Sequence, residues 1–359
     1  MILWEDPVKR KGNVFPLIVE HQNLRLAWLK ALRGKRKSPA VLLFSRNTDA
    51  NIGQIKARLE SEDPAWGNYR SFTISDPKAR TISAAPFPER VMHHAIMNIL
   101  EELFEKELIH HSYTCRKGKG THAAVLHAFH LSKAEGWFLK LDVRKYFDSI
   151  DHSVLKQQLS RLLKDEKLLH HLFLLIDSYH TQPGKGLPIG NLTSQYFANL
   201  YLSGLDHFIL EQQKPRVYVR YMDDFVLWSM RKADLVPVLQ EVQMYCAKNL
   251  KLTLKPAILG QSARGIPFLG FLIKSQGIYL LRKSKQRMKK RVSKMENDLV
   301  YGRANDAKAA ERAVSINAAV IIARCRTFRV TLWHGSGFGH EPRQTRGQLE
   351  QQCVELHRV

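Results

Sequence analysis

The sequence predicts an α+β fold in which helices pack on an antiparallel sheet, and three patterns support this. Alternating β-forming residues run on both sides of Asp223-Asp224, which predicts a β-hairpin over residues 216–229 with the two acids at its turn. The apolar run 137–142 predicts a buried strand that ends at Asp142. Amphipathic spacing predicts helices before, between and after these strands.

Two adjacent carboxylates are unfavourable at a hairpin turn unless a cation neutralises them. They repel each other, and a turn without Gly or Asn gains no structural benefit from them. A solvated Asp-Asp turn is the alternative, but apolar strands flank the pair in Tyr221-Met222-Asp223-Asp224 and favour a cleft. Together with Asp142, the pair forms a three-acid cluster that can hold two divalent ions about 4 Å apart. One ion would activate an attacking oxygen and the other would stabilise a leaving pyrophosphate.

The other elements follow from hydrophobic spacing and from helix and strand breakers. Asp151 is expected to cap a helix, and neither it nor Asp148 is expected to bind metal. The expected helices cover residues 22–33 and 51–60, begin at Pro86, cover 122–134, begin at Asp151, run from 191 to about 213, cover 236–250, begin at Arg282 and cover about 305–325. Strands are expected at 69–74 and 252–255, and a hairpin at 265–281.

Composition indicates a globular protein that binds a polyanion. With 359 residues, 44% of them hydrophobic, the chain can bury a sizeable core and is expected to form two or three subdomains. Its net charge of +23 makes nucleic acid the leading partner, ahead of a membrane surface. The longest apolar run, near 318–323, is too short to span a bilayer, and the first residues lack a signal-peptide pattern.

Cysteine and histidine usage argues against a structural metal site. The four cysteines lie far apart with no CxxC spacing, which fits a reducing cytoplasm and argues against zinc. Three pairs of adjacent histidines would point in different directions on a helix, so a histidine metal site is not expected. A soluble, cytoplasmic protein is therefore expected.

Two cationic stretches are candidates for contact with a nucleic-acid backbone. The stretch 116–121 places three cations around two glycines, before a helix whose N-terminus would attract phosphate; a solvated basic turn is the equal alternative. From Arg282, a helix carries a dense run of cations with few acids, and nucleic-acid contact is favoured over a solvated face. The cations expected to contact nucleic acid are Arg116, Lys117, Lys119, Lys285, Lys289, Lys290 and Arg291.

The order of these motifs resembles the seven-block core of a reverse transcriptase, over roughly residues 75–300. The Tyr-Met-Asp-Asp box at 221–224, preceded by Asp142, is the most specific element. Within that family, the loop 183–190 and the residues after it most resemble the reverse transcriptases of diversity-generating retroelements. Retroviral and group II intron enzymes carry Gln-Gly followed by Ser-Pro, whereas this sequence has Ile189-Gly190 and Ser194-Gln195. The stretches 116–124 and 265–270 are also similar to that subfamily.

The resemblance implies a right-hand polymerase fold with fingers, a palm built on the antiparallel sheet and its Tyr-Met-Asp-Asp hairpin, and a helical thumb. The N-terminal segment and fingers would take residues 1–135. The palm would take 136–281, with fingers helices returning at about 151–188, and the thumb and C-terminal tail would take 282–359.

The resemblance also implies a catalytic site for two Mg²⁺ ions, which Mn²⁺ could replace. Asp142 and Asp223 would bind both ions, with Asp224 beside them and the Val143 carbonyl as a further oxygen ligand. The general acid is not assigned, because Lys255 falls early in its expected strand.

For the incoming dNTP, the resemblance implies contacts from several motifs. Phe147 matches the aromatic steric gate that excludes a ribose 2′-OH, and Lys78 and Arg80 match the fingers cations on the triphosphate. Ile189 stands where a Gln would contact the nucleotide sugar and base, and Gln195 belongs to the same motif.

The implied function is that of an RNA-directed DNA polymerase, a nucleotidyltransferase that copies a retroelement template RNA with errors at adenines, as in mutagenic retrohoming. The implied partners are template RNA, cDNA or primer, dNTPs and a basic, oligomeric accessory protein, with no membrane. Another bacterial reverse transcriptase, of group II intron, retron or phage-defence type, is the first alternative. An RNA-dependent RNA polymerase is disfavoured, because it must accept the ribose 2′-OH that a gate at Phe147 would exclude. A non-catalytic, maturase-like RNA-binding protein would not retain three buried acids without metal.

Overall fold

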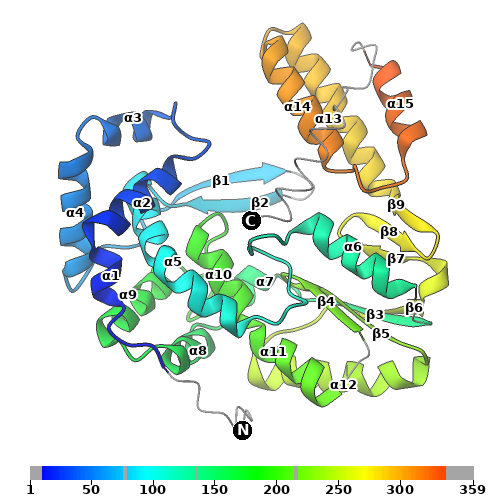
Figure 1. The fold of residues 1–359 in the computed structure, drawn as a ribbon, viewed down its shortest axis with the longest axis horizontal. Helices are drawn as coiled ribbons and strands as arrows, with labels where there is room; N and C mark the ends of the chain where they lie inside the picture. Colours follow the sequence, from blue (N-terminus) through cyan, green and yellow to red (C-terminus); the bar gives the residue numbers. More distant parts are fainter. Residues whose placement is uncertain (1–9, 76–78, 134–135, 214–216, 337–359) are drawn as a thin grey trace. The chain divides into compact units, whose positions relative to one another are not determined.

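The computed structural model describes residues 10–75, 79–133, 136–213 and 217–336 (Figure 1). The chain forms two compact units, and it crosses between them several times. Unit 1 comprises residues 1–110, 143–214 and 240–255, and unit 2 comprises 111–142, 215–239 and 256–359.

Unit 1 is mostly helical, and its helices pack around α5 (Phe87–Glu107). Pro88 lies in the first turn of α5, where its missing N–H costs nothing, and Val91, Ala95 and Ile96 form part of the buried face. The N-terminal helices α1 to α4 and α10 contact α5. The bounds of the other helices are α1 (Phe15–Val19), α2 (His21–Leu32), α3 (Pro39–Ser45), α4 (Thr48–Glu60), α7 (Tyr146–Ser149), α8 (His152–Leu162), α9 (Glu166–Asp177), α10 (Leu192–Tyr201), α11 (Ser203–His207) and a π-helix (Phe208–Gln213).

A β-hairpin in unit 1 joins β1 (Arg70–Ser75) to β2 (Ala79–Ala84) in antiparallel register, with Arg70 opposite Ala84. Every residue of β1 is exposed, and in β2 only Ser83, close to its end, is buried. The hairpin is therefore anchored at its base rather than along its length.

The helix expected from 191 to about 213 is not continuous. It ends as α10 at Tyr201, and α11 and the π-helix follow. The break falls at Leu202, directly before Ser203-Gly204, and such Ser/Gly pairs are common sites of helix kinks.

Unit 2 contains a four-stranded sheet that is antiparallel, as the sequence predicts. Its strand order is β4-β5-β3-β6, with β3 (Trp137–Asp142), β4 (Val217–Tyr221), β5 (Asp224–Ser229) and β6 (Ile258–Gln261). Helix α6 (Thr121–Ser132) packs on β4 and on a second, three-stranded sheet of β7 (Ile266–Phe268), β8 (Phe271–Lys274) and β9 (Gly277–Leu280). One core of buried residues, including Trp228, Phe268 and Trp333, continues from both sheets into the C-terminal helices.

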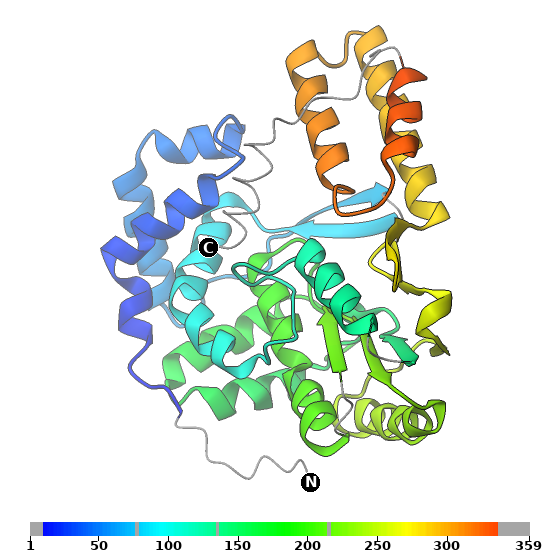
Figure 2. The ribbon, with the colours of Figure 1, turned by 45° about the vertical axis from the view of Figure 1, so that its right-hand side comes forward.

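The C-terminal helices of unit 2 are α13 (Arg282–Val300), α14 (Asp306–Ala318) and α15 (Arg326–His334), and they lie side by side (Figure 2). The indole Nε1 of Trp333 on α15 donates to Asn317 Oδ1 on α14 at 3.0 Å. The Lys285 ammonium on α13 lies 5.5 Å from the centre of the Phe328 ring on α15. Helix α12 (Lys232–Asn249) begins in unit 2 and ends in unit 1.

Three expected elements differ from the structure in unit 2 and beside it. Residues 252–255 contribute only an isolated bridge at Leu254, and the strand beside β3 is β6, because Pro256 interrupts the run with a residue that has no N–H. The expected hairpin at 265–281 is a three-stranded meander. The helix expected to reach Cys325 ends at Ala318, before Val320-Ile321-Ile322, since β-branched residues lower helix propensity.

Among the described residues, no helix is both long and apolar enough to cross a membrane.

Candidate active site

The β4–β5 hairpin brings the two adjacent acids of the Tyr-Met-Asp-Asp box next to the third acid. Asp224 pairs with Tyr221 across the hairpin and with Asp142 across the β3–β5 ladder, so Met222 and Asp223 form a two-residue turn. This is the expected arrangement of strand ends. It places two carboxylates on directly opposed residues and the third one residue away.

The turn holds a conformation that Met does not favour. Met222 has φ 56°, a left-handed value that two-residue hairpin turns take and that usually selects Gly or Asn. Beneath it, the Arg220 side chain is fully buried and its Nη1 donates to the Met222 carbonyl at 3.1 Å. A strained residue held by a buried cation is typical of a functional constraint rather than of a stabilising turn.

The carboxylate of Asp224 is buried beside two other acids, which favours a neighbouring cation. Burial raises the pKa of Asp224 to about 6, the Lys140 ammonium opposes this rise, and the charges of Asp142 and Asp223 add to it. Lys140, two residues before Asp142 on β3, forms an ion pair with Asp224, and both side chains are largely buried. The site therefore concentrates negative charge, and one protein cation offsets part of it.

The residues present fit hard divalent ions such as Mg²⁺, which take oxygen ligands. Asp142 and Asp223 offer carboxylate oxygens beside Asp224, whose own carboxylate is paired with Lys140. Within the part of the chain that the structure describes, no three acid, His or Cys side chains converge on a single preformed metal position. The assignment of Asp142, Asp223 and Asp224 as metal ligands remains a prediction.

In unit 1, the segment after Asp142 is fixed by backbone bonds. Val143 bridges Leu254, and the Arg144 N–H donates to the Thr253 carbonyl at 2.8 Å. Lys145 then takes a left-handed φ of 45° and begins α7. Phe147 on α7 is half-buried, with its ring at 5.9 Å from that of buried Tyr146. Phe147 is therefore not a core residue, as a steric gate requires.

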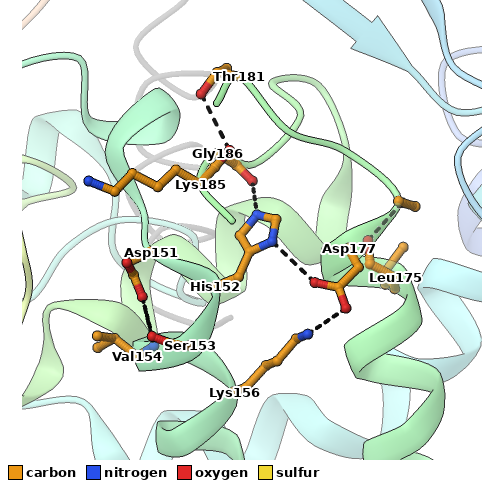
Figure 3. Close-up of polar contacts among 11 residues, drawn as sticks. Asp151, His152, Ser153, Val154, Lys156, Leu175, Asp177, Thr181, Lys185 and Gly186 are labelled. Carbon is orange, nitrogen blue, oxygen red and sulfur yellow. Dashed lines mark hydrogen bonds and ion pairs between the residues drawn. The ribbon is translucent and has the colours of Figure 1, made fainter. Parts of the chain in front are cut away.

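The loop 183–190 is bonded to the segment that carries Phe147. The Leu187 N–H donates to the Phe147 carbonyl and the Gly186 N–H to the Ile150 carbonyl, each at 2.9 Å. Figure 3 shows His152 between this loop and α9: its Nε2 lies 2.8 Å from the Gly186 carbonyl oxygen and its Nδ1 3.2 Å from Asp177 Oδ1. Half-buried Ile189 therefore lies two residues after Leu187, whose backbone these bonds hold in place.

Of the two cations expected at the triphosphate, only Arg80 belongs to the described residues of the β1–β2 hairpin. Arg80 is exposed on β2. Lys78 lies outside the described residues.

Gln195 lines a pocket in unit 1 that the sequence did not predict. The pocket has a volume of about 240 Å³ and lies between α2, α5 and α10. No acid is among the described residues that line it, and its cations come from distant parts of the sequence: Lys30, Arg33, Lys35 and Arg90. Two histidines, His93 and His94, lie beside them. Only the basic run beginning at Lys35 was visible as a cationic signal in the sequence.

The pocket is electrostatically prepared for an anion. Burial and the neighbouring Arg90 lower the pKa of Lys35, and burial, Lys30 and Arg33 lower the pKa of His94 to about 4. Since like charges depress the pKa of bases in this way, a bound phosphate would relieve the repulsion.

The basic stretch 116–121 in unit 2 is ordered by local contacts. Arg116 Nη1 donates to the Ser112 carbonyl at 2.8 Å, and the Lys119 ammonium lies 4.7 Å from the centre of the Tyr113 ring. Lys117 is exposed. Thr121 Oγ1 donates to the Tyr221 hydroxyl at 3.1 Å, which ties this stretch to the acid-bearing hairpin, a contact that the sequence did not reveal.

The cationic helix α13 presents an open depression of about 530 Å³ lined by Lys289, Lys290, Lys294 and Arg303. Asp298 also lines it and pairs with Arg303 and Arg312. Lys285, by contrast, is engaged with Phe328, and Arg291 lies beside a smaller apolar depression. The expected nucleic-acid contacts thus concentrate on Lys289 and Lys290.

Neutralising Lys289, Lys290 and Arg291 together to Gln should weaken template–primer binding for all sequences alike and reduce the slope of log K against log salt by up to about three, because each phosphate contact releases counterions. The measurement is fluorescence anisotropy across a salt series. The matched control is a triple Gln variant of Arg25, Lys56 and Lys106, each of which already pairs with an acid. An unchanged slope in the α13 variant would identify this face as merely solvated.

Three carboxylates at adjoining strand ends of an antiparallel sheet, in a strongly basic α+β chain, are the arrangement expected of a nucleic-acid polymerase. A family model described as reverse transcriptase (RNA-dependent DNA polymerase) matches residues 75–273, more than half of the chain. The protein belongs to this family.

Two of the following three curated relatives are named for an intron. The chain is 27% identical over 236 residues to the uncharacterized 91 kDa protein in cob intron of Schizosaccharomyces pombe, covering 57% of this chain and 28% of that protein. It is 27% identical over 141 residues to the group II intron-encoded protein LtrA of Lactococcus lactis, covering 37% and 23%. It is 24% identical over 223 residues to protein YkfC of Escherichia coli, covering 50% and 58%. In each case the match spans less than two thirds of the relative.

Proposed function

We propose that the protein is an RNA-directed DNA polymerase of a diversity-generating retroelement, which copies a template RNA into cDNA with frequent errors at adenines. The observation that carries the polymerase activity is the pairing of Asp142 with Asp224 beside the Asp223 turn, in a chain of the reverse transcriptase family. Asp142 and Asp223 hold two divalent ions, with Asp224 and the Val143 carbonyl beside them. Bound Mg²⁺ supplies activation of the primer 3′-hydroxyl and stabilisation of the leaving pyrophosphate.

The remaining residues select and hold the substrates in this proposal. Half-buried Phe147 excludes a ribose 2′-OH, and Arg80 and Lys78 bind the triphosphate. The basic pocket beside Gln195 and the cations of α13 bind phosphates of the template and product strands. A net charge of +23 supports a nucleic-acid partner, and a basic, oligomeric accessory protein completes the proposed complex in the cytoplasm.

The support for the diversity-generating subtype is Ile189-Gly190 together with Ser194-Gln195. Ile189 lies in a loop that hydrogen bonds fix at Gly186 and Leu187, so its side chain is presented from a defined backbone. An apolar side chain there fills space but removes one polar contact that checks nucleotide geometry.

A group II intron-type reverse transcriptase is the second candidate, and the relatives favour it. LtrA is named as a group II intron-encoded protein, and the Schizosaccharomyces pombe relative is encoded in an intron. Such an enzyme also synthesises cDNA, so the two candidates differ in the errors that they make.

The test of polymerase activity is extension of a labelled DNA primer on an RNA template with four dNTPs and Mg²⁺. We expect full-length product that disappears when the template, dNTPs or Mg²⁺ is left out. RNA binding without any extension, with and without candidate accessory protein, would instead indicate a non-catalytic RNA-binding protein.

Changing Ile189 to Gln should lower the misincorporation rate by about tenfold while leaving total synthesis within about twofold, because a restored hydrogen-bond partner discriminates more strongly than shape filling alone. The measurement is sequencing of cDNA made by the two enzymes on one template. Ile189→Val, which stays apolar, is the matched control and should keep the wild-type error rate. Equal error rates in the Gln variant and the wild type would remove Ile189 from nucleotide selection.

A further inference from the structure

Strand β2 of the fingers hairpin is held at its base by three hydrogen bonds to residues 189–191. The Ser83 N–H donates to the Ile189 carbonyl at 2.9 Å. The Asn191 side chain makes the other two: Nδ2 donates to the Ser83 carbonyl at 2.9 Å, and Oδ1 accepts from the Ala85 N–H at 3.0 Å. We call these three bonds the β2 clamp. In it, one carboxamide satisfies a donor and an acceptor of the backbone, as a neighbouring strand would.

The residues of the clamp are buried and closely packed. Asn191 is 3% exposed and Ser83 is 1% exposed. Gly190 has φ 113°, and a Cβ on it would lie 2.6 Å from the Cγ2 atom of Ile82. Glycine is therefore required at this point both by conformation and by the close approach of β2.

The clamp joins the segments that carry three residues of the proposed nucleotide site. Arg80 lies on β2, three residues before the clamped Ser83. Ile189 is itself in the clamp through its carbonyl, and Leu187, two residues earlier, donates to the carbonyl of Phe147. All of these residues belong to unit 1. A path of hydrogen bonds therefore runs from β2 through Ser83 and Ile189 to Leu187 and the carbonyl of Phe147, and the side chain of Asn191 adds two further bonds where it meets β2.

The start of β1, at the other side of the hairpin base, is held by a separate contact. The Tyr69 hydroxyl, just before β1, lies 2.9 Å from Ser178 Oγ at the end of α9. Because β1 is exposed and β2 is buried only at Ser83, the position of the outer hairpin depends on the two sides of its base. Asn191 holds the side nearest to Arg80 through its side chain.

We propose that Asn191 is a positioning residue for the incoming nucleotide: its carboxamide sets where β2, and with it Arg80, stands relative to Ile189 and Phe147. This proposal rests on the proposed polymerase function. Asn191 does not itself touch the nucleotide. It acts by holding three substrate-side segments in one geometry, so its loss should weaken nucleotide capture more than the chemical step.

The test compares Asn191→Ala with Asn23→Ala. Asn23 is a matched control, since it is a buried asparagine of the same unit whose Nδ2 donates to the Ile18 and Ala95 carbonyls at 2.9 and 3.1 Å, away from the proposed nucleotide residues. Both variants should lose thermal stability. Only Asn191→Ala should raise the KM for dNTP by about tenfold, with kcat within about twofold, because misplacing binding groups by a fraction of an ångström impairs alignment.

A second variant covers the case in which Asn191→Ala does not fold. Asn191→Asp keeps the acceptor for the Ala85 N–H but sets a carboxylate oxygen against the Ser83 carbonyl in place of the donor, so its KM should also rise. Because it adds a negative charge beside the basic pocket, RNA affinity is measured alongside, and the KM is taken at saturating template–primer. An unchanged KM in the folded Asn191 variants, or an equal rise in Asn23→Ala, would overturn the proposal.

Hydrogen exchange separates a failure of this proposal from a failure of the polymerase function. In the wild type, the amides of Ser83 and Ala85 should exchange slowly, and in Asn191→Ala they should exchange at least about tenfold faster, since the amide of Ala85 loses its partner and the clamp loosens. Asn23→Ala should leave them unchanged. If the wild type makes no DNA, the polymerase proposal fails on that result alone. Unchanged exchange in Asn191→Ala would refute the clamp whether or not DNA is made.

Discussion

Replacing Asp223 by Asn is expected to lower dNTP incorporation by at least about a hundredfold, because it removes a charge that stabilises a metal-bound transition state, a contribution of several kcal/mol. Asp223 lies in the β4–β5 turn, outside the paired residues of the strand ladder, so the fold should survive the change. Template–primer affinity should stay within about twofold, since no phosphate contact is lost. Single-turnover primer extension and anisotropy measure the two quantities.

Asp234→Asn is the matched control for this change. Asp234 is also an acid of unit 2, but it accepts from Ser229 Oγ at 2.7 Å and pairs with Arg231. Its variant should lose at most a little stability and keep its activity. More than a few per cent of wild-type incorporation in Asp223→Asn, at equal RNA affinity, would contradict the assignment of the three acids.

Replacing Phe147 by Ala is expected to reduce the discrimination between dNTPs and rNTPs by about a hundredfold, because a cavity would open where the 2′-OH is otherwise excluded. The ring of Phe147 is half-buried and rests against Tyr146, while its backbone carbonyl is held by Leu187. The substitution therefore removes the ring and leaves the backbone anchored. The measurement is the ratio of kcat/KM for dCTP and CTP on one template.

Phe173→Ala serves as the control for loss of an aromatic ring. Phe173 is a half-buried phenylalanine on α9 of the same unit, and the Lys156 ammonium lies 5.4 Å from its ring centre. Its variant should discriminate between the two sugars as the wild type does. Equal discrimination in the Phe147 variant would mean that this ring has only a packing role.

The strands of the acid site could be predicted from the sequence because local pattern decides them. The strand 137–142 has the predicted bounds, and β4 and β5 end next to the predicted acids, since alternation of side chains and a turn fix the register of a hairpin. The cap of α8 was also predicted: Asp151 accepts from the Val154 N–H at 3.2 Å. Such features depend on residues that are close in sequence.

The basic pocket and the β2 clamp could not be predicted, because they depend on contacts between distant residues. Arg33, directly after α2, and Arg90 on α5 line the same pocket only after those helices pack, and neither stands out in its own segment. Asn191 looked like the polar start of a helix, and it does precede α10, yet its side chain makes no cap and bonds to β2 instead. Tertiary contact thus overrode the local role that the residue type favours.

The most direct measurement of the proposed function is deep sequencing of cDNA that the wild-type protein makes on an RNA template containing all four bases. If the protein is the reverse transcriptase of a diversity-generating retroelement, the cDNA should be complementary to the template, with frequent misincorporation concentrated opposite adenines. Full-length cDNA with uniformly low error at all four bases would contradict this proposal and favour the group II intron-type enzyme.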